Sequence, residues 1–265
     1  MMLPAGVNTD ENRVRELAAA VREVVESEEL PSAQFALAHN GRLVAFETFG
    51  KRNSDAATLY TGFSVIKAVT SSALWLLLED QRLSLRDRVV DHIHEFDTNG
   101  KDAVRVEHLL THTAGFPAAP FAACDWDDTE RRAARFRQWR LDWAPGSRFV
   151  YHPVATMWVV AALIESVTES DYRIFIRNRV LSPLGLDDLY LGLGDSAGID
   201  GSERRNVEAR IADLVAVGKP PRADSPQSYI LPEDLEADGG FLDVCNSRAY
   251  REVGVPGGGL SLIHI

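Results

Sequence analysis

A nearly continuous apolar helix is the feature that most constrains this chain. Residues 65–78 are apolar on almost every side of a helix, and a helix without a polar face is usually buried. Lys67 nevertheless lies in its first turn, where a buried ammonium is costly unless it is paired or deprotonated. Ser64 precedes Lys67 by three residues, so the hydroxyl and the amine lie on one helical face. The spacing predicts a serine nucleophile beside a lysine of lowered pKa.

The choice of lysine supports this interpretation. The chain has 28 lysines and arginines, and only Lys51, Lys67, Lys101 and Lys219 are lysines. Arginine does not give up its proton in a protein, whereas a desolvated lysine can. The alternative is that the Ser-x-x-Lys spacing arose by chance and that Lys67 reaches to the surface along its aliphatic stem.

Composition narrows the class of partner. The chain has 265 residues and a net charge of −11, which argues against nucleic acid and against an anionic membrane surface. No apolar run is long enough to span a bilayer, and the first residues do not form a signal peptide. We therefore expect a cytoplasmic protein with no nucleic-acid or membrane partner.

Hydrophobic periodicity predicts mostly helices after an initial hairpin. Residues 10–28 have the pattern of an amphipathic helix. Residues 34–38 and 43–49 are typical of strands, and Asn40-Gly41 between them is a strong hairpin signal. Further helices are expected over 106–113, 128–139, 154–167, 171–181 with Ser170 as N-cap, and near 204–217.

The predicted sheet is incomplete. Two strands alone are marginal, and an antiparallel sheet needs further strands to be stable. The remaining strands would have to follow residue 265, so we expect the chain to stop inside its domain.

Five stretches resemble one protein superfamily. They are FSVIK (63–67), LSLRDRVVDHI (83–93), VRVEHLLTHTAGFP (104–117), PGSRFVYHPVATMWVVAALIESVT (145–168) and PLGLDDL (183–189). Their order and spacing resemble the serine β-lactamases and penicillin-binding proteins, and within them the class C-like branch of esterases and D-amino-acid peptidases. The resemblance covers roughly residues 30–190, with weaker support from Pro256-Gly257-Gly258-Gly259.

This resemblance implies an α/β (α+β) fold of the β-lactamase type, in which an antiparallel sheet flanked by helices accompanies a mostly helical lobe. The whole chain, 1–265, is then one partial domain. We place the helical lobe at about 61–239 and the sheet lobe at about 1–60 and 240–265.

The resemblance also implies roles for individual residues. Ser64 would be acylated, Lys67 would help to remove its proton, and Tyr151 would shuttle a proton between Ser64 and the leaving group. The family usually has an asparagine two residues after this tyrosine, and this chain has Pro153. We expect His152 and Pro153 to lie in the substrate-binding region, and the missing amide favours an esterase over a true β-lactamase.

The family's third motif, Lys-Thr-Gly or His-x-Gly on a strand, does not occur in the sequence. In relatives it follows the Pro-Gly-Gly-Gly loop at a distance. We therefore expect a C-terminal truncation, and the family pattern does not match Ser261–Ile265.

The predicted function is acyl transfer from a small carboxylic ester, or from an amide, to water through an acyl-enzyme. Serine, lysine and tyrosine supply the nucleophile and the bases, so no cofactor is needed. Within the family the alternatives are a D-aminoacyl peptidase or carboxypeptidase and a weak β-lactamase. A further alternative is a non-catalytic penicillin-binding-like protein.

A histidine cluster raises a different alternative, a metal-dependent hydrolase. His92, His94, His108 and His112 lie within a short span. His108 and His112 are four residues apart, but the segment lacks the glutamate of a zinc-protease helix. No carboxylate or cysteine is placed to complete a metal site. We therefore expect no metal and a structural role for residues 108–115.

Overall fold

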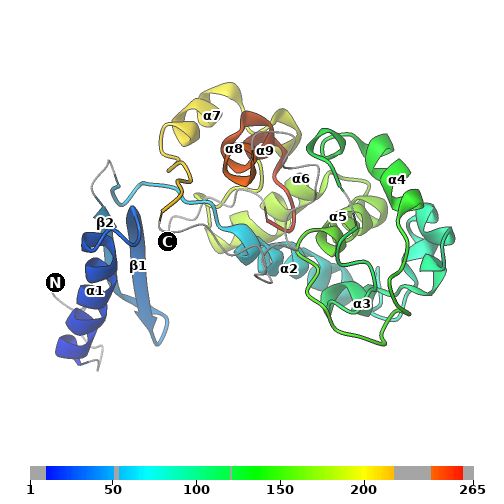
Figure 1. Ribbon diagram of the computed structural model, residues 1–265, viewed down its shortest axis with the longest axis horizontal. Coiled ribbons are helices and arrows are strands. Elements are labelled where there is room, and N and C mark those ends of the chain that lie inside the picture. Colours follow the sequence, from blue (N-terminus) through cyan, green and yellow to red (C-terminus); the bar gives the residue numbers. More distant parts are fainter. Residues whose placement is uncertain (1–9, 51–53, 120, 218–239, 259–265) are drawn as a thin grey trace.

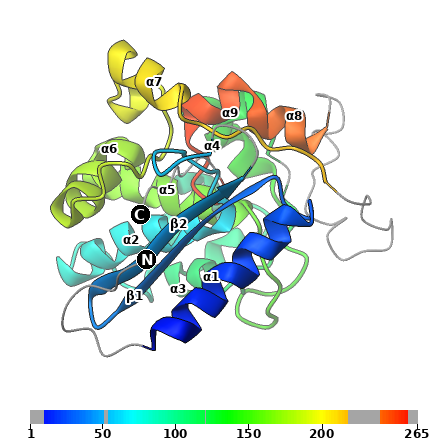
Figure 2. The same cartoon turned by 90° about the vertical axis from the view of Figure 1, so that its left-hand side faces the viewer.

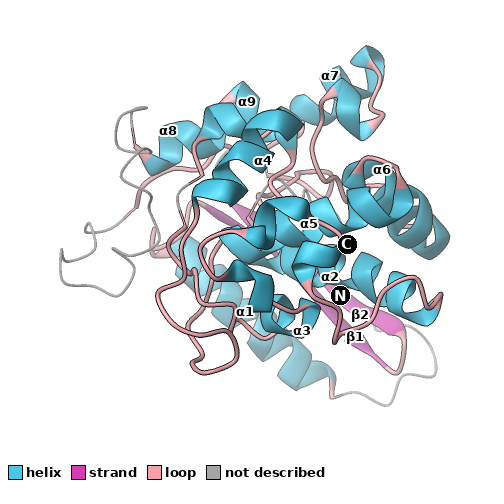
Figure 3. Ribbon diagram, turned by 90° about the vertical axis from the view of Figure 1, so that its right-hand side faces the viewer, coloured by secondary structure: helices cyan, strands magenta, loops and turns pink. Residues whose placement is uncertain are grey.

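The computed structural model describes residues 10–50, 54–119, 121–217 and 240–258. Residues 218–239 and Ser261–Ile265 lie outside these ranges. The elements are α1 (Glu11–Glu26), β1 (Ser32–His39), β2 (Arg42–Gly50), α2 (Ile66–Glu79), α3 (Val106–Leu110), α4 (Thr129–Gln138), α5 (Ala155–Thr168), α6 (Tyr172–Ile176), α7 (Gly201–Glu208), α8 (Phe241–Asn246) and α9 (Arg248–Val253). Helices predominate, and the strands of the described ranges form one two-stranded sheet (Figure 3). In those ranges no helix has the length and apolar character needed to cross a bilayer.

The N-terminal helix and hairpin form as the sequence predicts. The Asp10 carboxylate caps α1 by accepting hydrogen bonds from the backbone N–H groups of Asn12 and Arg13. β1 and β2 pair antiparallel. Asn40 and Gly41 between them have φ of 51° and 73°, and two left-handed residues in succession are what a type I′ hairpin turn requires.

α1 packs along this hairpin (Figure 2). Two small apolar clusters join them, Val14 with Val44 and Ala45, and Ala18 and Val25 with Phe49. These clusters are separate from the main core, which lies among the helices. The chain therefore buries apolar surface in two places, and Figure 1 shows the α1–hairpin unit beside the larger helical body.

α2 and α5 pack together at the centre of that body. Most of α5 is buried, including the Trp158 ring. α2 buries Ile66, Ala73 and Leu74 but leaves Trp75 54% exposed. The expectation of a buried helix therefore holds for most of α2, and Trp75 is the exception among its large apolar side chains.

The cap of α6 differs from the prediction. The Asp171 carboxylate, not Ser170, accepts the N-terminal hydrogen bond, from the Arg173 backbone N–H. The same carboxylate pairs with the buried Arg173 guanidinium at 2.7 Å, and this second contact explains why Asp171 takes the cap position. α7 also begins earlier than expected, at Gly201, with Asp200 as its cap.

Residues 240–258 pack against the helices. We expected them in the sheet lobe, but they form α8 and α9 (Figure 1). The backbone N–H groups of Leu193 and Gly194 donate to carbonyls of α9 at 3.0 Å. The buried Tyr172 hydroxyl donates to the Gly254 carbonyl at 2.7 Å. These bonds hold the segment on the helical body. The rest of the predicted division into two lobes, and the assignment of the chain to one domain, stay predictions.

Gly254 permits the close approach that these bonds need. Its φ is 66°, and a Cβ added there would lie 2.5 Å from the Leu191 carbonyl carbon and would also overlap the Gly192 amide nitrogen. Backbone atoms cannot move aside as the tip of a long side chain can. A glycine is therefore required where residues 191–194 run past the end of α9.

We expect Gly254→Ala to lower the free energy of unfolding by roughly 2–5 kcal/mol, the sum of left-handed strain and overlap. Gly185→Ala is a matched control, because Gly185 also has φ of 66° but nothing lies within 4 Å of its added Cβ. The control should lose only the strain, roughly 1–2 kcal/mol. Urea unfolding of both variants measures the difference, and equal losses would contradict the close-approach argument.

Candidate active site

Ser64 and Lys67 meet at the start of α2. Ser64 lies in a short 3-10 turn, Phe63–Val65, that leads directly into the helix. The Lys67 Nζ donates to the Ser64 Oγ at 3.2 Å. The serine side chain is exposed whereas the lysine is 9% exposed. The first turn of the helix thus presents a hydroxyl to solvent and keeps the amine beneath it.

Burial lowers the pKa of Lys67, and the nearby Tyr151 hydroxyl partly opposes this shift. Desolvation disfavours the ammonium, so the neutral amine forms at a lower pH than in water. A neutral amine within hydrogen-bond reach of a hydroxyl can accept its proton.

Lys101 shows that a buried lysine alone does not mark an active site. It is fully buried, and its Nζ donates to the Thr98 carbonyl, the Thr98 hydroxyl and the Trp139 carbonyl at 2.8–2.9 Å. Burial lowers the pKa of Lys101 to about 8. The difference at Lys67 is that its hydroxyl partner, Ser64, is open to solvent.

Tyr151 also contacts the serine. Its Oη is 2.7 Å from the Ser64 Oγ, with either oxygen able to donate. The Lys67 Nζ is 5.3 Å from the centre of the Tyr151 ring, within cation–π distance. The structure therefore brings the three predicted catalytic residues together around one oxygen atom.

His152 lies elsewhere. Its side chain is fully buried, its Nε2 accepts from the Phe116 backbone N–H at 3.2 Å, and its Nδ1 is 2.6 Å from the Val150 carbonyl. Burial lowers its pKa to about 4, so the ring is neutral with its proton on Nδ1. This location does not fit the predicted role in substrate binding, because both ring nitrogens are occupied by backbone groups away from solvent.

Pro153 is half-buried and follows this inward-facing histidine. Its carbonyl oxygen would lie 3.2 Å from a Cβ added at Gly257. The proline therefore packs against the turn that follows α9, while its ring stays partly open to solvent.

That turn contributes two contacts to the site that the sequence did not predict. The Lys67 Nζ donates to the Gly257 carbonyl, and the Thr70 hydroxyl donates to the Pro256 carbonyl at 3.0 Å. A Cβ at Gly257 would lie 3.0 Å from the Met157 Cβ. Residues 256–258 form a turn, and the absence of side chains on its glycines was the available signal for close packing.

The four clustered histidines make separate contacts. In the described ranges no group of three or more histidine, cysteine, aspartate or glutamate side chains could hold a metal ion. The His108 Nδ1 accepts from the Arg105 backbone N–H at 3.1 Å. The His92 Nε2 lies 3.5 Å from the Asp87 Oδ2. These contacts give two of the four histidines structural partners.

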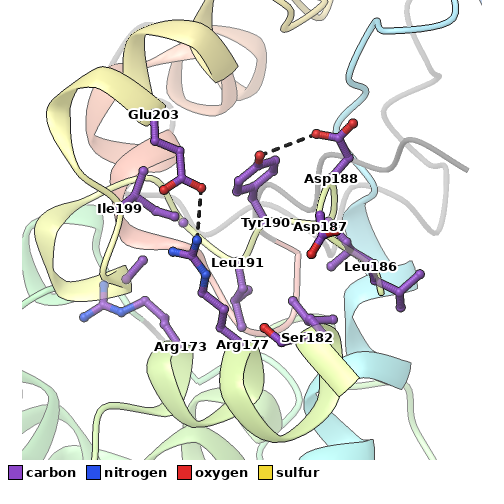
Figure 4. Close-up of a pocket in the computed structure, with 14 residues that line it drawn as sticks. Arg173, Arg177, Ser182, Leu186, Asp187, Asp188, Tyr190, Leu191, Ile199 and Glu203 are labelled. Atoms are coloured by element: carbon purple, nitrogen blue, oxygen red, sulfur yellow. Dashed lines mark hydrogen bonds and ion pairs between the residues drawn. The ribbon is translucent and has the colours of Figure 1, made fainter. Parts of the chain in front are cut away.

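A cavity of about 250 Å³ lies between α6 and α7 (Figure 4). Arg177 and Glu203 form an ion pair of 3.0 Å at this cavity, and the Tyr190 hydroxyl donates to Asp188 at 3.5 Å. None of the three predicted catalytic residues lines it. The cavity is therefore distinct from the site around Ser64.

The buried His152 predicts a pH dependence of stability. The unfolded imidazole takes up a proton as the pH falls through about 6.5, whereas the folded ring, with a pKa of about 4, does not. A lowered folded-state pKa of a base means that the unfolded state binds more protons, so the free energy of unfolding falls between about pH 6.5 and 4 and levels off below. His152→Gln keeps an acceptor at the ε position but does not titrate. Between about pH 6.5 and 4 its free energy of unfolding should therefore fall by roughly 2–3 kcal/mol less than that of the unmodified protein. Urea unfolding from pH 7 to 4 tests this, and parallel curves for the two proteins would contradict it.

The chain is similar to known proteins over part of their length. It is 27% identical over 134 residues to "Esterase/beta-lactamase LipL" of Mycobacterium tuberculosis (strain ATCC 25618 / H37Rv), a match that covers 49% of this chain and 30% of that protein. The match spans about a third of each of the curated relatives most similar in sequence.

Solved structures with a similar fold include the following two. One is a penicillin-binding protein homologue from Caulobacter crescentus, with a TM-score of 0.69, 28% identity, and coverage of 91% of this chain and 64% of that chain. The other is a family VIII carboxylesterase, with a TM-score of 0.75, 24% identity, and coverage of 98% and 68%.

The family model described as Beta-lactamase matches residues 17–261, nearly the whole chain. The mixed helix-and-hairpin architecture agrees with it, so the predicted β-lactamase-like fold is confirmed. The chain belongs to the beta-lactamase family.

Proposed function

We propose that the protein that carries this chain is a serine hydrolase that acts through an acyl-enzyme on Ser64. The observation that carries the proposal is the position of the Ser64 Oγ, 2.7 Å from the Tyr151 Oη and 3.2 Å from the Lys67 Nζ. A nucleophile activated by adjacent bases is the arrangement that covalent catalysis uses.

The proposed reaction has two halves. The Ser64 Oγ attacks the carbonyl carbon of the substrate while its proton passes to the Lys67–Tyr151 pair. The leaving alkoxide takes up a proton from this pair as its bond to the carbonyl carbon breaks. Water then attacks the acyl carbon and gives a proton to the same pair. The bond between this carbon and the Ser64 Oγ breaks, the pair returns a proton to the Ser64 Oγ, and the acid is released.

The Gly257 carbonyl supports the lysine in this scheme. As an acceptor it binds one N–H of Lys67, which limits the rotation of the amine. The remaining positions of the nitrogen can then face Ser64. Preorganised groups of this kind lower the cost of reaching the transition state.

Small carboxylic esters are the proposed substrates. Pro153 presents no side-chain amide two residues after Tyr151, and the resemblance assigns the family's asparagine amide at that position a part in holding the acyl side chain and the lysine. The relative named as an esterase/β-lactamase agrees with this class. Turnover of p-nitrophenyl butyrate should therefore exceed turnover of nitrocefin, a β-lactam.

A D-aminoacyl peptidase is the second candidate. A relative from Escherichia coli (strain K12) named "Putative D-alanyl-D-alanine carboxypeptidase", 31% identical over 143 residues, favours it. Release of D-alanine from a D-alanyl-D-alanine peptide faster than ester hydrolysis would support this candidate. If the protein is instead a non-catalytic penicillin-binding-like protein, a covalent probe should label it, but it should not turn over esters or peptides.

The first functional prediction concerns Ser64. A fluorophosphonate probe should label Ser64, because the serine is exposed and the Tyr151 Oη and the Lys67 Nζ both lie within hydrogen-bond distance of its Oγ. Ser64→Ala should abolish hydrolysis of p-nitrophenyl acetate and butyrate, and peptide mass analysis should locate the label. Ser54→Ala, in a residue outside this constellation, is the control and should keep activity. Labelling of another serine, with Ser64→Ala fully active, would refute the proposal.

The second functional prediction separates charge from basicity at Lys67. Lys67→Arg keeps a positive charge but cannot accept a proton, so it should lose at least ~10²-fold in kcat/KM, about as much as Lys67→Ala. Tyr151→Phe keeps the ring and removes the hydroxyl, and it should also lose at least ~10²-fold. The double variant should fall far less than the product of the two losses, because the residues act as one unit.

Two outcomes would alter this mechanism. An arginine variant with much of the wild-type activity would make Lys67 a source of charge only. A Tyr151→Phe variant within a few-fold of wild type would leave Ser64 and Lys67 as a dyad.

A further inference from the structure

His112 has a backbone conformation that few residues adopt. It follows α3 with φ of 56°, in the left-handed region where asparagine, aspartate and histidine are the commonest residues after glycine. Among the residues that the structure describes, His112 belongs to no group that could hold a metal ion. It also takes part in no step of the proposed reaction. Its contacts nevertheless all lead to the segment that carries Tyr151.

Two hydrogen bonds tie His112 to the residues on either side of Tyr151. The Val150 backbone N–H donates to the His112 carbonyl at 3.2 Å. The His152 backbone N–H donates to the His112 Nδ1 at 3.1 Å. One residue therefore fixes the backbone both before and after the tyrosine.

The imidazole also packs directly on the tyrosine. The ring centres of His112 and Tyr151 are 4.8 Å apart, and those of His112 and His152 are 5.9 Å apart in a stacked arrangement. Tyr151 is still 41% exposed, so its own burial fixes its position only in part.

The imidazole is in the state that these contacts require. Burial, followed by the charge of nearby Lys67, lowers the pKa of His112. The ring is therefore neutral at pH 7, its Nδ1 lone pair is free to accept, and its proton lies on Nε2. A protonated ring would lose the bond to the His152 N–H.

We propose that His112 is a positioning residue for the reaction. Its Nδ1 accepts from the His152 backbone N–H, and this bond fixes the adjacent Tyr151 so that its hydroxyl stays at the Ser64 oxygen. The inference rests on the proposed function, because positioning matters only if Tyr151 takes part. A displacement of about 1 Å in a catalytic group can cost about 10²-fold in rate.

Two substitutions at His112 separate the acceptor from the ring. His112→Asn keeps an acceptor at the δ position and tolerates the left-handed backbone, but it removes the ring. His112→Phe keeps a ring and removes the acceptor. The phenylalanine variant should lose ~10²-fold in kcat with KM within about threefold of wild type. The asparagine variant should recover at least ~10-fold of that loss.

A double-mutant cycle with Tyr151→Phe tests whether His112 acts through the tyrosine. Once the hydroxyl is gone, its position no longer matters. His112→Phe should therefore cost less than about threefold further in that background. A full ~10²-fold loss there would overturn the proposal. So would a His112→Phe variant within about threefold of wild type, or an asparagine variant no better than it.

The tautomer of His112 gives a test on the unmodified protein, which holds even if His112→Phe fails to fold. A long-range ¹H–¹⁵N spectrum at pH 7 should show a neutral ring with its proton on Nε2. A proton on Nδ1 would overturn the inference. Ser64→Ala separates the two levels: an active Ser64→Ala variant refutes the proposed function itself, whereas an inactive one with Tyr151→Phe unimpaired refutes only the role of His112.

Discussion

The rest of the site depends on burying one amine. Removing an ammonium from water is costly, and the cost falls when polar groups surround it or when it loses its proton. At Lys67 the polar groups come from three separate parts of the chain: the Ser64 hydroxyl in the 3-10 turn that leads into α2, the Tyr151 ring from the segment before α5, and the Gly257 carbonyl from the turn after α9. One side chain thus joins residues that are up to 190 positions apart.

The turn after α9 reaches Lys67 only because a series of contacts carries it there. Tyr172 and Arg173 at the start of α6 bind the carbonyls at 253 and 254, and Gly254 allows the backbone to pass close to residues 191–194. The Thr70 hydroxyl then binds the Pro256 carbonyl. None of this was available from periodicity, because α8 and α9 have six residues each and helices so short owe their stability to tertiary contacts. Long elements with strong patterns, such as α1, α5 and the Asn40-Gly41 hairpin, were predicted correctly.

The predicted site shows the same division between local pattern and tertiary packing. Ser64 and Lys67 were found because their spacing on a helix fixes their proximity, and the superfamily resemblance added Tyr151. His152 differs from the prediction for a local reason. Tyr151 is 41% exposed, whereas His152 next to it is fully buried with both ring nitrogens on backbone groups. Adjacent residues can therefore face different surroundings, which a position beside a catalytic candidate does not reveal. The proposed role of His112 was not predictable, because it depends on a left-handed turn and on a hydrogen bond to a residue 40 positions away.

The charge distribution around Lys67 gives its lowered pKa a chemical meaning. A carboxylate beside a buried lysine would stabilise the ammonium and raise its pKa. The chain has 39 aspartates and glutamates, yet the groups that shift the pKa of Lys67 are the surrounding apolar volume and the Tyr151 hydroxyl. Arg173, by contrast, is buried next to the carboxylates of Asp171 and Asp127, which is the arrangement that keeps a cation charged. Within one fold, a guanidinium with acidic partners therefore serves as a fixed structural charge, whereas an amine among a hydroxyl, a carbonyl and a phenol is left able to exchange its proton.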